Sequence, residues 1–412
     1  MQQEKATVIV LSVVVFLVLM GLTLITPVLP FYAQALGATI PMVGLLISGF
    51  ALARVFVNIP AGVWGDRVGH RRVMSYGLLI IAVSSFLAGL AFNYWVLLAV
   101  RVAEGVGSAL YVTTSMAVLV RSVPKARRGE YMSYYVAALI AGAVSGPAAG
   151  GFLAVTFGLT APFLFYALVA FVALFLVRVF LRETIRERVQ EAVGLEDVVR
   201  LLRSPSFLLV TLGALSVFLL RGGFNATLFP LWAEARFGLD PVFIGLILTL
   251  VAVAGLVTML ISGRLADRIG RKGPLMASLL LSGLILPFIF LTQTLGALSL
   301  TMVMFGLALG LHGPIAAWAA DLAPEGSIGV AMGVYRSIAD IGWVVGPLLL
   351  GSLGVAFGPL ETNVWPFVAA AVWAIFFGLL LIPARDPVAQ RRGEVPVLGN
   401  GGSQRSGGRG ST

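Results

Sequence analysis

Cysteine is absent from this chain of 412 residues, which excludes disulfides, thiolate catalysis and cysteine-bound metal sites. The 2 histidines, His70 and His312, lie far apart in the sequence, so we expect no histidine-based metal site and no cofactor. Charged residues are also scarce, at 11%, against the roughly 25% typical of soluble domains. A soluble protein of this size is therefore excluded, because too few polar side chains are present to cover its surface.

Hydrophobic residues, in contrast, make up 59% of the chain, and the mean hydropathy is +1.00. A membrane helix needs roughly 20 mostly apolar residues, and apolar runs bounded by proline, glycine or charge clusters supply them repeatedly. We therefore predict an all-α integral membrane protein with twelve transmembrane helices. The predicted spans are residues 7–29, 41–62, 73–92, 95–119, 131–155, 162–181, 207–232, 241–262, 275–293, 297–320, 329–356 and 364–384.

Lysine and arginine show a strong preference for one side of the membrane. With the N-terminus inside the cell, 23 of the 28 basic residues fall on the cytoplasmic side, Arg236 falls in an outer loop, and the remaining four lie within the spans. This bias predicts a multi-pass protein of the cell (inner) membrane with both termini in the cytoplasm. It also accounts for the net charge of +10, so we expect the lipid bilayer, and no nucleic acid, as a partner.

Two segments fall outside the predicted spans. Residues 183–206 alternate apolar and charged side chains, which is typical of a short amphipathic helix on the membrane surface. Residues 385–412 are rich in glycine, serine and arginine, and we expect a disordered cytoplasmic tail. The chain is thus predicted to consist of an N-terminal six-helix bundle, 1–182, a linker, and a C-terminal six-helix bundle, 207–384.

The two predicted bundles repeat each other in sequence. The motif GVWGDRVGHRR at 62–72 follows the second span, and GRLADRIGRK at 263–272 follows the eighth span, 201 residues later. Gly146-Pro147 in the fifth span matches Gly346-Pro347 in the eleventh, 200 residues later. Two similar halves in one membrane protein favour alternating-access transport, with a substrate site between the halves near the middle of the membrane.

The motif at 62–72 resembles the signature between helices two and three of the major facilitator superfamily. In the fourth span, Arg101, Glu104 and Gly105 are similar to that superfamily's pattern, which usually has glutamine where Glu104 stands. The resemblance implies a transporter rather than an enzyme, and we expect a monomer with a small-molecule substrate. The fifth span resembles the corresponding helix of the superfamily's proton-coupled drug antiporters, and the residues that match are Gly142, Gly146, Pro147, Gly150 and Gly151. The resemblance implies that this segment is a hinge or a seal.

The glycine-rich motif predicts a latch at the cytoplasmic face. Gly65 and Gly69 have no side chain to keep two helices apart, and Asp66 is expected to meet the N-terminus of the eleventh span, whose helix dipole favours a carboxylate. Such a contact needs closed cytoplasmic ends, so it would stabilise the outward-open state. The alternative is a basic loop that only sets topology. The gating residues of both halves are Gly62, Gly65, Asp66, Arg67, Gly69, Arg71, Asp267, Arg268 and Gly270.

Charged residues inside the spans are costly and are therefore candidates for function. Spacing allows each acid to pair with an arginine of its own helix; the pairs are Arg101–Glu104 and Arg336–Asp340, which leaves Arg54 and Arg221 unpartnered. The excess of arginine favours an anionic or polarised ligand group, and the alternative is that every arginine bonds only to backbone carbonyls. The candidate substrate-binding residues are Arg54, Arg101, Arg221, Asn225 and Arg336.

A proton-coupled transporter needs a buried carboxylate that gains and loses its proton as access alternates. Asp340, with Glu104 as second choice, is assigned to this task, because these are the acids deep in the predicted spans. His312 is a weaker candidate that a structural hydrogen bond would explain equally well. The first span has no charged residue where the related antiporters often have an acid, which argues against a cationic drug as the coupled substrate.

Two functions remain open at this point. The first is an antiporter that exports small amphipathic compounds in exchange for protons, favoured by the fifth-span glycines and the two buried acids. The second is a facilitator or proton symporter that imports a small anionic metabolite, favoured by the arginines. A non-transporting membrane sensor is disfavoured because both halves keep the motif. No nucleotide-binding or nucleophile motif supports an enzyme, so a gradient must supply the energy.

Overall fold

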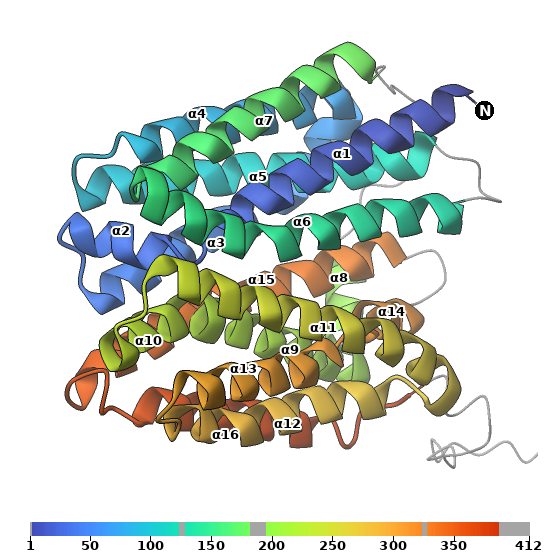
Figure 1. Cartoon of the computed structure of the whole chain (residues 1–412). Helices are drawn as coiled ribbons and strands as arrows, with labels where there is room; N and C mark the ends of the chain where they lie inside the picture. The colour runs from blue at the N-terminus through green and yellow to red at the C-terminus, as the bar shows by residue number, and fades with distance from the viewer. Residues whose placement is uncertain (1, 123–127, 182–194, 324–327, 387–412) are drawn as a thin grey trace, which may run out of the picture.

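The computed structural model describes residues 2–122, 128–181, 195–323 and 328–386, and Figure 1 shows its arrangement. Within these ranges every regular element is a helix. Eleven of the described helical segments are long and apolar enough to cross a membrane, and Trp365–Leu380 is a shorter apolar helix. The predicted all-α membrane fold is therefore confirmed, with its twelfth span as the shortest.

The helices of the first half form one bundle (Figure 1). Within it α1 packs against α6 and α7, α4 packs against α5 and α7, and α3 packs against α5. These elements are α1 (Gln2–Leu24), α2 (Leu29–Ala35), α3 (Ile40–Val68), α4 (His70–Gly89), α5 (Tyr94–Ser122), α6 (Arg128–Phe157) and α7 (Ala161–Phe180).

The helices of the second half form the other bundle. Its first span is a continuous helical run, Pro205–Phe237, whose middle part is the π-helix η2. The elements are α8 (Leu195–Leu202), α9 (Pro205–Leu219), η2 (Leu220–Leu228), α10 (Phe229–Phe237), α11 (Pro241–Ile269), α12 (Lys272–Phe290), α13 (Leu295–Gly310), α14 (Ile315–Asp321), α15 (Ile328–Ala356) and α16 (Trp365–Leu380). Of the predicted linker helix, α8 is described, whereas residues 182–194 and the tail 387–412 lie outside the described residues.

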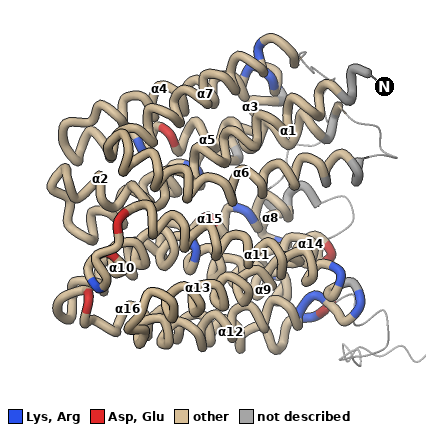
Figure 2. The backbone as a smooth tube through the Cα atoms, viewed as in Figure 1, with Lys and Arg blue, Asp and Glu red and all other residues tan. Residues whose placement is uncertain are grey.

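Among the described residues, two main seams join the bundles: α3 packs against α15, and α6 packs against α11; smaller contacts join α3 to η2 and α2 to α10. One end of the molecule carries α2 and α10 and is called the α2–α10 end. The opposite end carries Gly69 and Gly270 and is called the motif end. Figure 2 shows lysine and arginine at the motif end of both bundles.

The predicted loops at 62–72 and 263–272 are mostly helical, and this corrects the sequence interpretation. Helix α3 continues to Val68 and α4 begins at His70, so only Gly69 separates them; α11 continues to Ile269 and α12 begins at Lys272, so Gly270 and Arg271 separate them. Gly69 has φ of 108° and Gly270 has φ of 97°, a conformation that side chains with a Cβ rarely adopt. The positive-φ glycines fall at equivalent places in the two bundles: Gly37, Gly69 and Gly158 in the first, Gly238, Gly270 and Gly358 in the second.

Candidate functional site

An acidic side chain of the second bundle is held by polar side chains of the first, where α3 crosses α15. Asp340 on α15 is 1% exposed. Its Oδ2 atom accepts a hydrogen bond from Nδ2 of Asn58 at 3.1 Å and lies 3.4 Å from Nη2 of Arg54. Because Arg54 and Asn58 are one turn apart on α3, they present their side chains on one face. The three residues, with Arg336, are called the α3–α15 cluster.

Arg336 completes this cluster from the same helix as Asp340. Its Nε atom lies 3.4 Å from Oδ1 of Asp340, and its side chain remains 42% exposed. The predicted pair within α15 is thus confirmed. The prediction that Arg54 lacks a partner is wrong, since Arg54 shares the carboxylate of Asp340 across the bundle interface. The buried carboxylate therefore has a guanidinium group on each side, which compensates for the loss of water around it.

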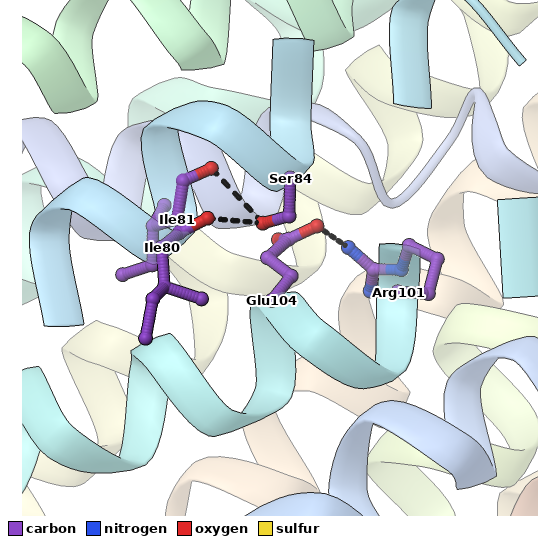
Figure 3. Close-up of polar contacts among 5 residues, drawn as sticks. All are labelled: Ile80, Ile81, Ser84, Arg101 and Glu104. Atoms are coloured by element: carbon purple, nitrogen blue, oxygen red, sulfur yellow. Dashed lines mark hydrogen bonds and ion pairs between the residues drawn. The ribbon is translucent and has the colours of Figure 1, made fainter. Parts of the chain in front are cut away.

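The second buried acid is paired entirely within the first bundle. Nη1 of Arg101 donates to Oε2 of Glu104 at 2.7 Å, and both residues are buried. This confirms the predicted pair, which Figure 3 shows beside Ser84. The Ser84 hydroxyl donates to the carbonyls of Ile80 and Ile81, and Oε1 of Glu104 has no hydrogen-bond partner among the described residues. Glu104 therefore lacks the cross-bundle contact that Asp340 has.

Phe50 connects the two ion pairs, and sequence reasoning missed it. The Cζ atom of Arg101 lies 4.7 Å from the centre of the Phe50 ring, and that of Arg54 lies 5.9 Å from it. Helices α3 and α5 approach closely here, because a Cβ on Gly105 would overlap the backbone carbonyl of Phe50. The face of an aromatic ring attracts a guanidinium group. Phe50 therefore allows two like charges to lie near each other, and its spacing of four residues from Arg54 was the available signal.

Arg221 and Asn225 lie on the π-helix η2, in the middle of the seventh span. Arg221 is exposed and forms no ion pair with another described residue, and Oδ1 of Asn225 is buried without a hydrogen-bond partner in the described part of the chain. Tyr335, Arg336 and His312 are the electrostatic neighbours of Arg221. The ring of His312 bonds to the carbonyl of Leu309, as its structural interpretation predicts.

The π-helix itself was not predicted from the sequence of this span. Its turn is wider by one residue, and Oγ1 of Thr227 donates to the carbonyl of Gly222 at 2.9 Å, five residues earlier. A Cβ on Gly223 would lie 2.6 Å from the carbonyl of Gly346, so α15 approaches the backbone of η2. Such π-helical turns occur frequently at functional sites. The adjacent glycines, Gly222 and Gly223, were the only sequence signal.

The fifth-span glycines bring α6 close to two neighbours. A Cβ on Gly142, Gly146 or Gly150 would overlap atoms of α1 in the same bundle. On the other side, a Cβ on Gly151 would overlap the carbonyl of Pro241, and a Cβ on Gly245 would overlap that of Pro147, both across the α6–α11 seam. These residues therefore serve close helix packing, and their role as a hinge or seal stays a prediction.

The two bundles touch through their backbones toward the α2–α10 end. A Cβ on Gly44 would overlap the carbonyl of Pro347, and Oγ of Ser48 donates to the carbonyl of Val344 at 2.6 Å. Toward the motif end, in contrast, a Cβ on Gly263 or Gly333 would meet no described atom within 4 Å. The described interface is therefore tight at the α2–α10 end.

The latch prediction is not tested by these contacts. The side chains of Asp66 and Asp267, and residues 324–327 before α15, lie outside the described residues. Around them, Gly65 leaves space for the ring of His70, and Arg71 donates to the backbone carbonyl of Arg178 on α7. The remaining gating residues are at the motif end, with Gly62 partly buried and Arg67 and Arg268 exposed.

Comparisons with known proteins agree with this geometry. Multidrug resistance protein 2 of Bacillus subtilis (strain 168) is 28% identical over 396 residues, which cover 92% of this chain and 96% of that protein. Multidrug resistance protein MdtG of Enterobacter lignolyticus is 28% identical over 388 residues, covering 90% of this chain and 93% of MdtG. The chain thus matches both multidrug resistance proteins over nearly their whole length.

Solved structures show the same fold. A bacterial homologue of the human lysosomal transporter Spinster, in an inward-facing and unoccupied conformation, has a TM-score of 0.79 at 17% identity, covering 93% of this chain and 97% of that one. The nucleoside transporter NupG has a TM-score of 0.77 at 12% identity, with 91% and 99% covered. The family model of the Major Facilitator Superfamily matches residues 11–230 and 210–401. This chain belongs to the Major Facilitator Superfamily of membrane transporters.

Proposed function

We propose that the protein is a proton-coupled antiporter that exports small amphipathic compounds by alternating access. The observation that carries this proposal is the α3–α15 cluster, in which Asp340 of one bundle is held by Arg54 and Asn58 of the other. Two relatives that match over most of their length are named multidrug resistance proteins, which supports export. The moving bodies are residues 1–182 and 207–384, connected by 183–206.

The membrane orientation is part of the proposal. The protein acts as a monomer in the inner membrane, with both termini and the motif end in the cytoplasm, because basic residues concentrate in cytoplasmic loops. The α2–α10 end then faces outward, and its close backbone contacts correspond to a state closed toward the outside. The latch around Asp66 would form in the opposite state.

The cluster provides the coupling. In the state closed toward the outside, an ionised Asp340 attracts Arg54 and holds the middles of α3 and α15 together, so the empty, ionised carrier does not open outward. In the outward-open state, a proton taken up from outside neutralises Asp340 and removes that attraction. When the outer end closes again, Arg54 returns to 3.4 Å and stabilises the ionised carboxylate, so the proton leaves toward the cytoplasm. The proton is thereby carried inward.

Export requires that the substrate can replace the proton in this role. The guanidinium of Arg336 lies over the Phe218 ring, 5.2 Å from its centre. A compound bound between the bundles beside these two residues would compete with Arg54 for Asp340 and so separate the outer ends. Either a proton or a substrate then permits the change of state. Because both act on the same carboxylate, they move in opposite directions. Glu104 is the second choice, because its ion-pair partner Arg101 lies on the same helix and no contact among the described residues links it to the other bundle.

Proteoliposomes with an imposed pH gradient test the proposal, with a panel of fluorescent amphipathic dyes as the probes. Asp340→Asn should abolish gradient-driven dye accumulation but keep dye exchange. Asp321→Asn is the matched control, because Asp321 also forms an ion pair, with Arg271 at 3.0 Å, but lies at the motif end. Accumulation that survives in Asp340→Asn and is lost in Glu104→Gln would move the proton to Glu104. Survival in both variants would refute proton antiport.

Arg221 favours a second candidate, a facilitator or proton symporter for a small anion. Its guanidinium is exposed and forms no ion pair within the described ranges, so it is available to a carboxylate ligand. A radiolabelled small carboxylate separates the two functions. In symport, inward proton flow drives its uptake, and Arg221→Gln weakens that uptake. In antiport, the same gradient drives dye extrusion.

A further inference from the structure

One arginine at the middle of the membrane is open to solvent. Arg221 lies on η2, within the helical run Pro205–Phe237, and it is exposed. Helix η2 packs against α3 of the first bundle and against α15 of its own bundle. A charged side chain at this depth faces water or a ligand rather than lipid. Arg221 therefore marks a position beside the bundle interface that a polar group of a ligand can reach.

Arg336 links this position to the buried carboxylate of the α3–α15 cluster. It is an electrostatic neighbour of Arg221, and its Nε atom lies 3.4 Å from Oδ1 of Asp340. Its side chain is 42% exposed, so a ligand can reach this residue as well. Two charged groups of opposite sign, Arg221 and Asp340, are thus found on either side of Arg336.

Aromatic rings supply an apolar surface close to these charges. The Phe218 ring belongs to the turn before Arg221, and its centre lies 5.2 Å from the guanidinium of Arg336. The Trp343 ring packs against η2, where a Cβ on Gly222 would lie 2.8 Å from its Cε3 atom, and Trp343 is partly exposed. Apolar and aromatic side chains with a few polar groups among them are typical of ligand sites. The apolar body of an amphipathic compound can therefore lie between two charged ends.

The balance of charge restricts which compounds fit. Arg54, Arg221 and Arg336 carry three positive charges, against the one negative charge of Asp340. A compound that takes the place of Arg54 at Asp340, as the proposed antiport requires, must bring a positive or hydrogen-bond-donating group of its own. A simple cation is repelled by the remaining arginines, and a simple anion cannot take the place of Arg54. A compound that carries both kinds of group meets both conditions.

We propose, on the basis of the antiport function, that the exported compounds are amphipathic zwitterions, whose acid group binds Arg221 and whose ammonium or N–H group binds Asp340. Arginine suits the acid group, because its N–H donors form paired bonds with carboxylate oxygens. The amine takes over the ion-pair role of Arg54, which releases α3 from α15. A zwitterion has no net charge, so its entry adds nothing to the repulsion among the three arginines.

Binding to the purified full-length protein, measured by dansyl fluorescence without any gradient, tests the substrate class. Three probes share one scaffold: Nε-dansyl-lysine is a zwitterion, its methyl ester is a cation, and its Nα-acetyl derivative is an anion. The wild type should bind the zwitterion about tenfold more tightly than either derivative, because each derivative loses one charge-assisted contact. Rhodamine 110 and its methyl ester, rhodamine 123, repeat the comparison of acid with ester on a second scaffold.

Substitutions assign the acid group to its arginine. Arg221→Gln should lower the affinity for Nε-dansyl-lysine about tenfold without weakening the binding of its methyl ester. Arg221→Lys should keep most of the preference for the zwitterion, since the positive charge remains. Arg236→Gln is the matched control and should change neither affinity, because Arg236 is an exposed arginine of the same helical run at the α2–α10 end.

Three results would overturn the zwitterion proposal. The first is a wild type that prefers the acid to the ester on neither scaffold. The second is an Nα-acetyl derivative that binds as tightly as the zwitterion, which would indicate a site for a simple anion. The third is unchanged zwitterion affinity in Arg221→Gln with a normal unfolding temperature. Because binding is measured without a gradient, a failure of proton antiport would leave these affinities unchanged and is recognised separately in proteoliposomes.

Discussion

Replacing Asp340 with asparagine removes a negative charge that two guanidinium groups approach to 3.4 Å. The side chain keeps its shape and can still accept a bond from Asn58, so the change isolates the charge. Of the two arginines, Arg54 alone belongs to the other bundle. We assign the Arg54–Asp340 ion pair about 1.5–3 kcal/mol, the range for a hydrogen bond to a charged group, and 1.4 kcal/mol corresponds to a factor of ten. The population closed at the α2–α10 end should therefore fall about 10- to 100-fold relative to the open one.

Spin labels measure this shift directly, because the chain has no native cysteine. Gln34→Cys on α2 and Ala235→Cys on α10 place two exposed labels on opposite bundles at the α2–α10 end. The distance distribution should move to longer values in Asp340→Asn. Acidification should move the wild type in the same direction, since a protonated Asp340 resembles asparagine, and should leave the variant unchanged.

A matched control separates the cross-bundle contact from the local one. Arg336→Gln removes the guanidinium that lies on the same helix as Asp340, so it should change the distances less than Arg54→Gln does. If the Asp340→Asn distribution coincides with that of the wild type at both acidic and alkaline pH, the reasoning is refuted. Equal shifts in the two arginine variants would show that the contact between bundles has no special role.

Other substitutions address the remaining features of the site. Phe50→Leu should lower the initial transport rate several-fold and Phe50→Tyr should restore it, because a cation–π contact contributes about 0.5–2 kcal/mol. Glu104→Gln should lower the unfolding temperature in differential scanning fluorimetry, since breaking a buried ion pair costs about 3–5 kcal/mol; an unchanged temperature would contradict the pair's structural importance. Gly44→Ala should lengthen the spin-label distance, as the added methyl group overlaps α15. Arg221→Gln should change stability by no more than about 0.5 kcal/mol but weaken binding of carboxylate probes in equilibrium dialysis.

The membrane helices and the repeat were predictable because they depend on local sequence. An apolar run of sufficient length has few alternatives to a membrane helix, and the equivalent glycines Gly69 and Gly270 mark the same turn in both bundles. The pairs Arg101–Glu104 and Arg336–Asp340 were predictable for the same reason, since helical spacing alone brings their side chains together.

The features that sequence reasoning missed depend on contacts between distant segments. Asn58 and Asp340 are 282 residues apart, and no pattern within either helix indicates that they meet. The partner of Arg54 was therefore assigned wrongly. The π-helical turn at Arg221 also has no distinctive composition, because it differs from an α-helix only in which carbonyl each N–H reaches. The extension of α3 to Val68 was missed because glycine and charged residues were interpreted as a loop.

The position of the α3–α15 cluster along α15 sets a ratio between the movements at the two ends of the molecule. Along α15, at 1.5 Å per residue, Ile328 lies about 18 Å from Asp340 toward the motif end, and Pro347 lies about 10 Å from it toward the α2–α10 end. If the bundles rotate about the cluster by about 15°, a size known for subunit rotations, Ile328 travels about 5 Å and Pro347 travels about 3 Å in the opposite direction. The side chains of the cluster move less than either end, over the distance in which an ion pair forms or breaks, so a single proton can be matched to a movement much larger than itself.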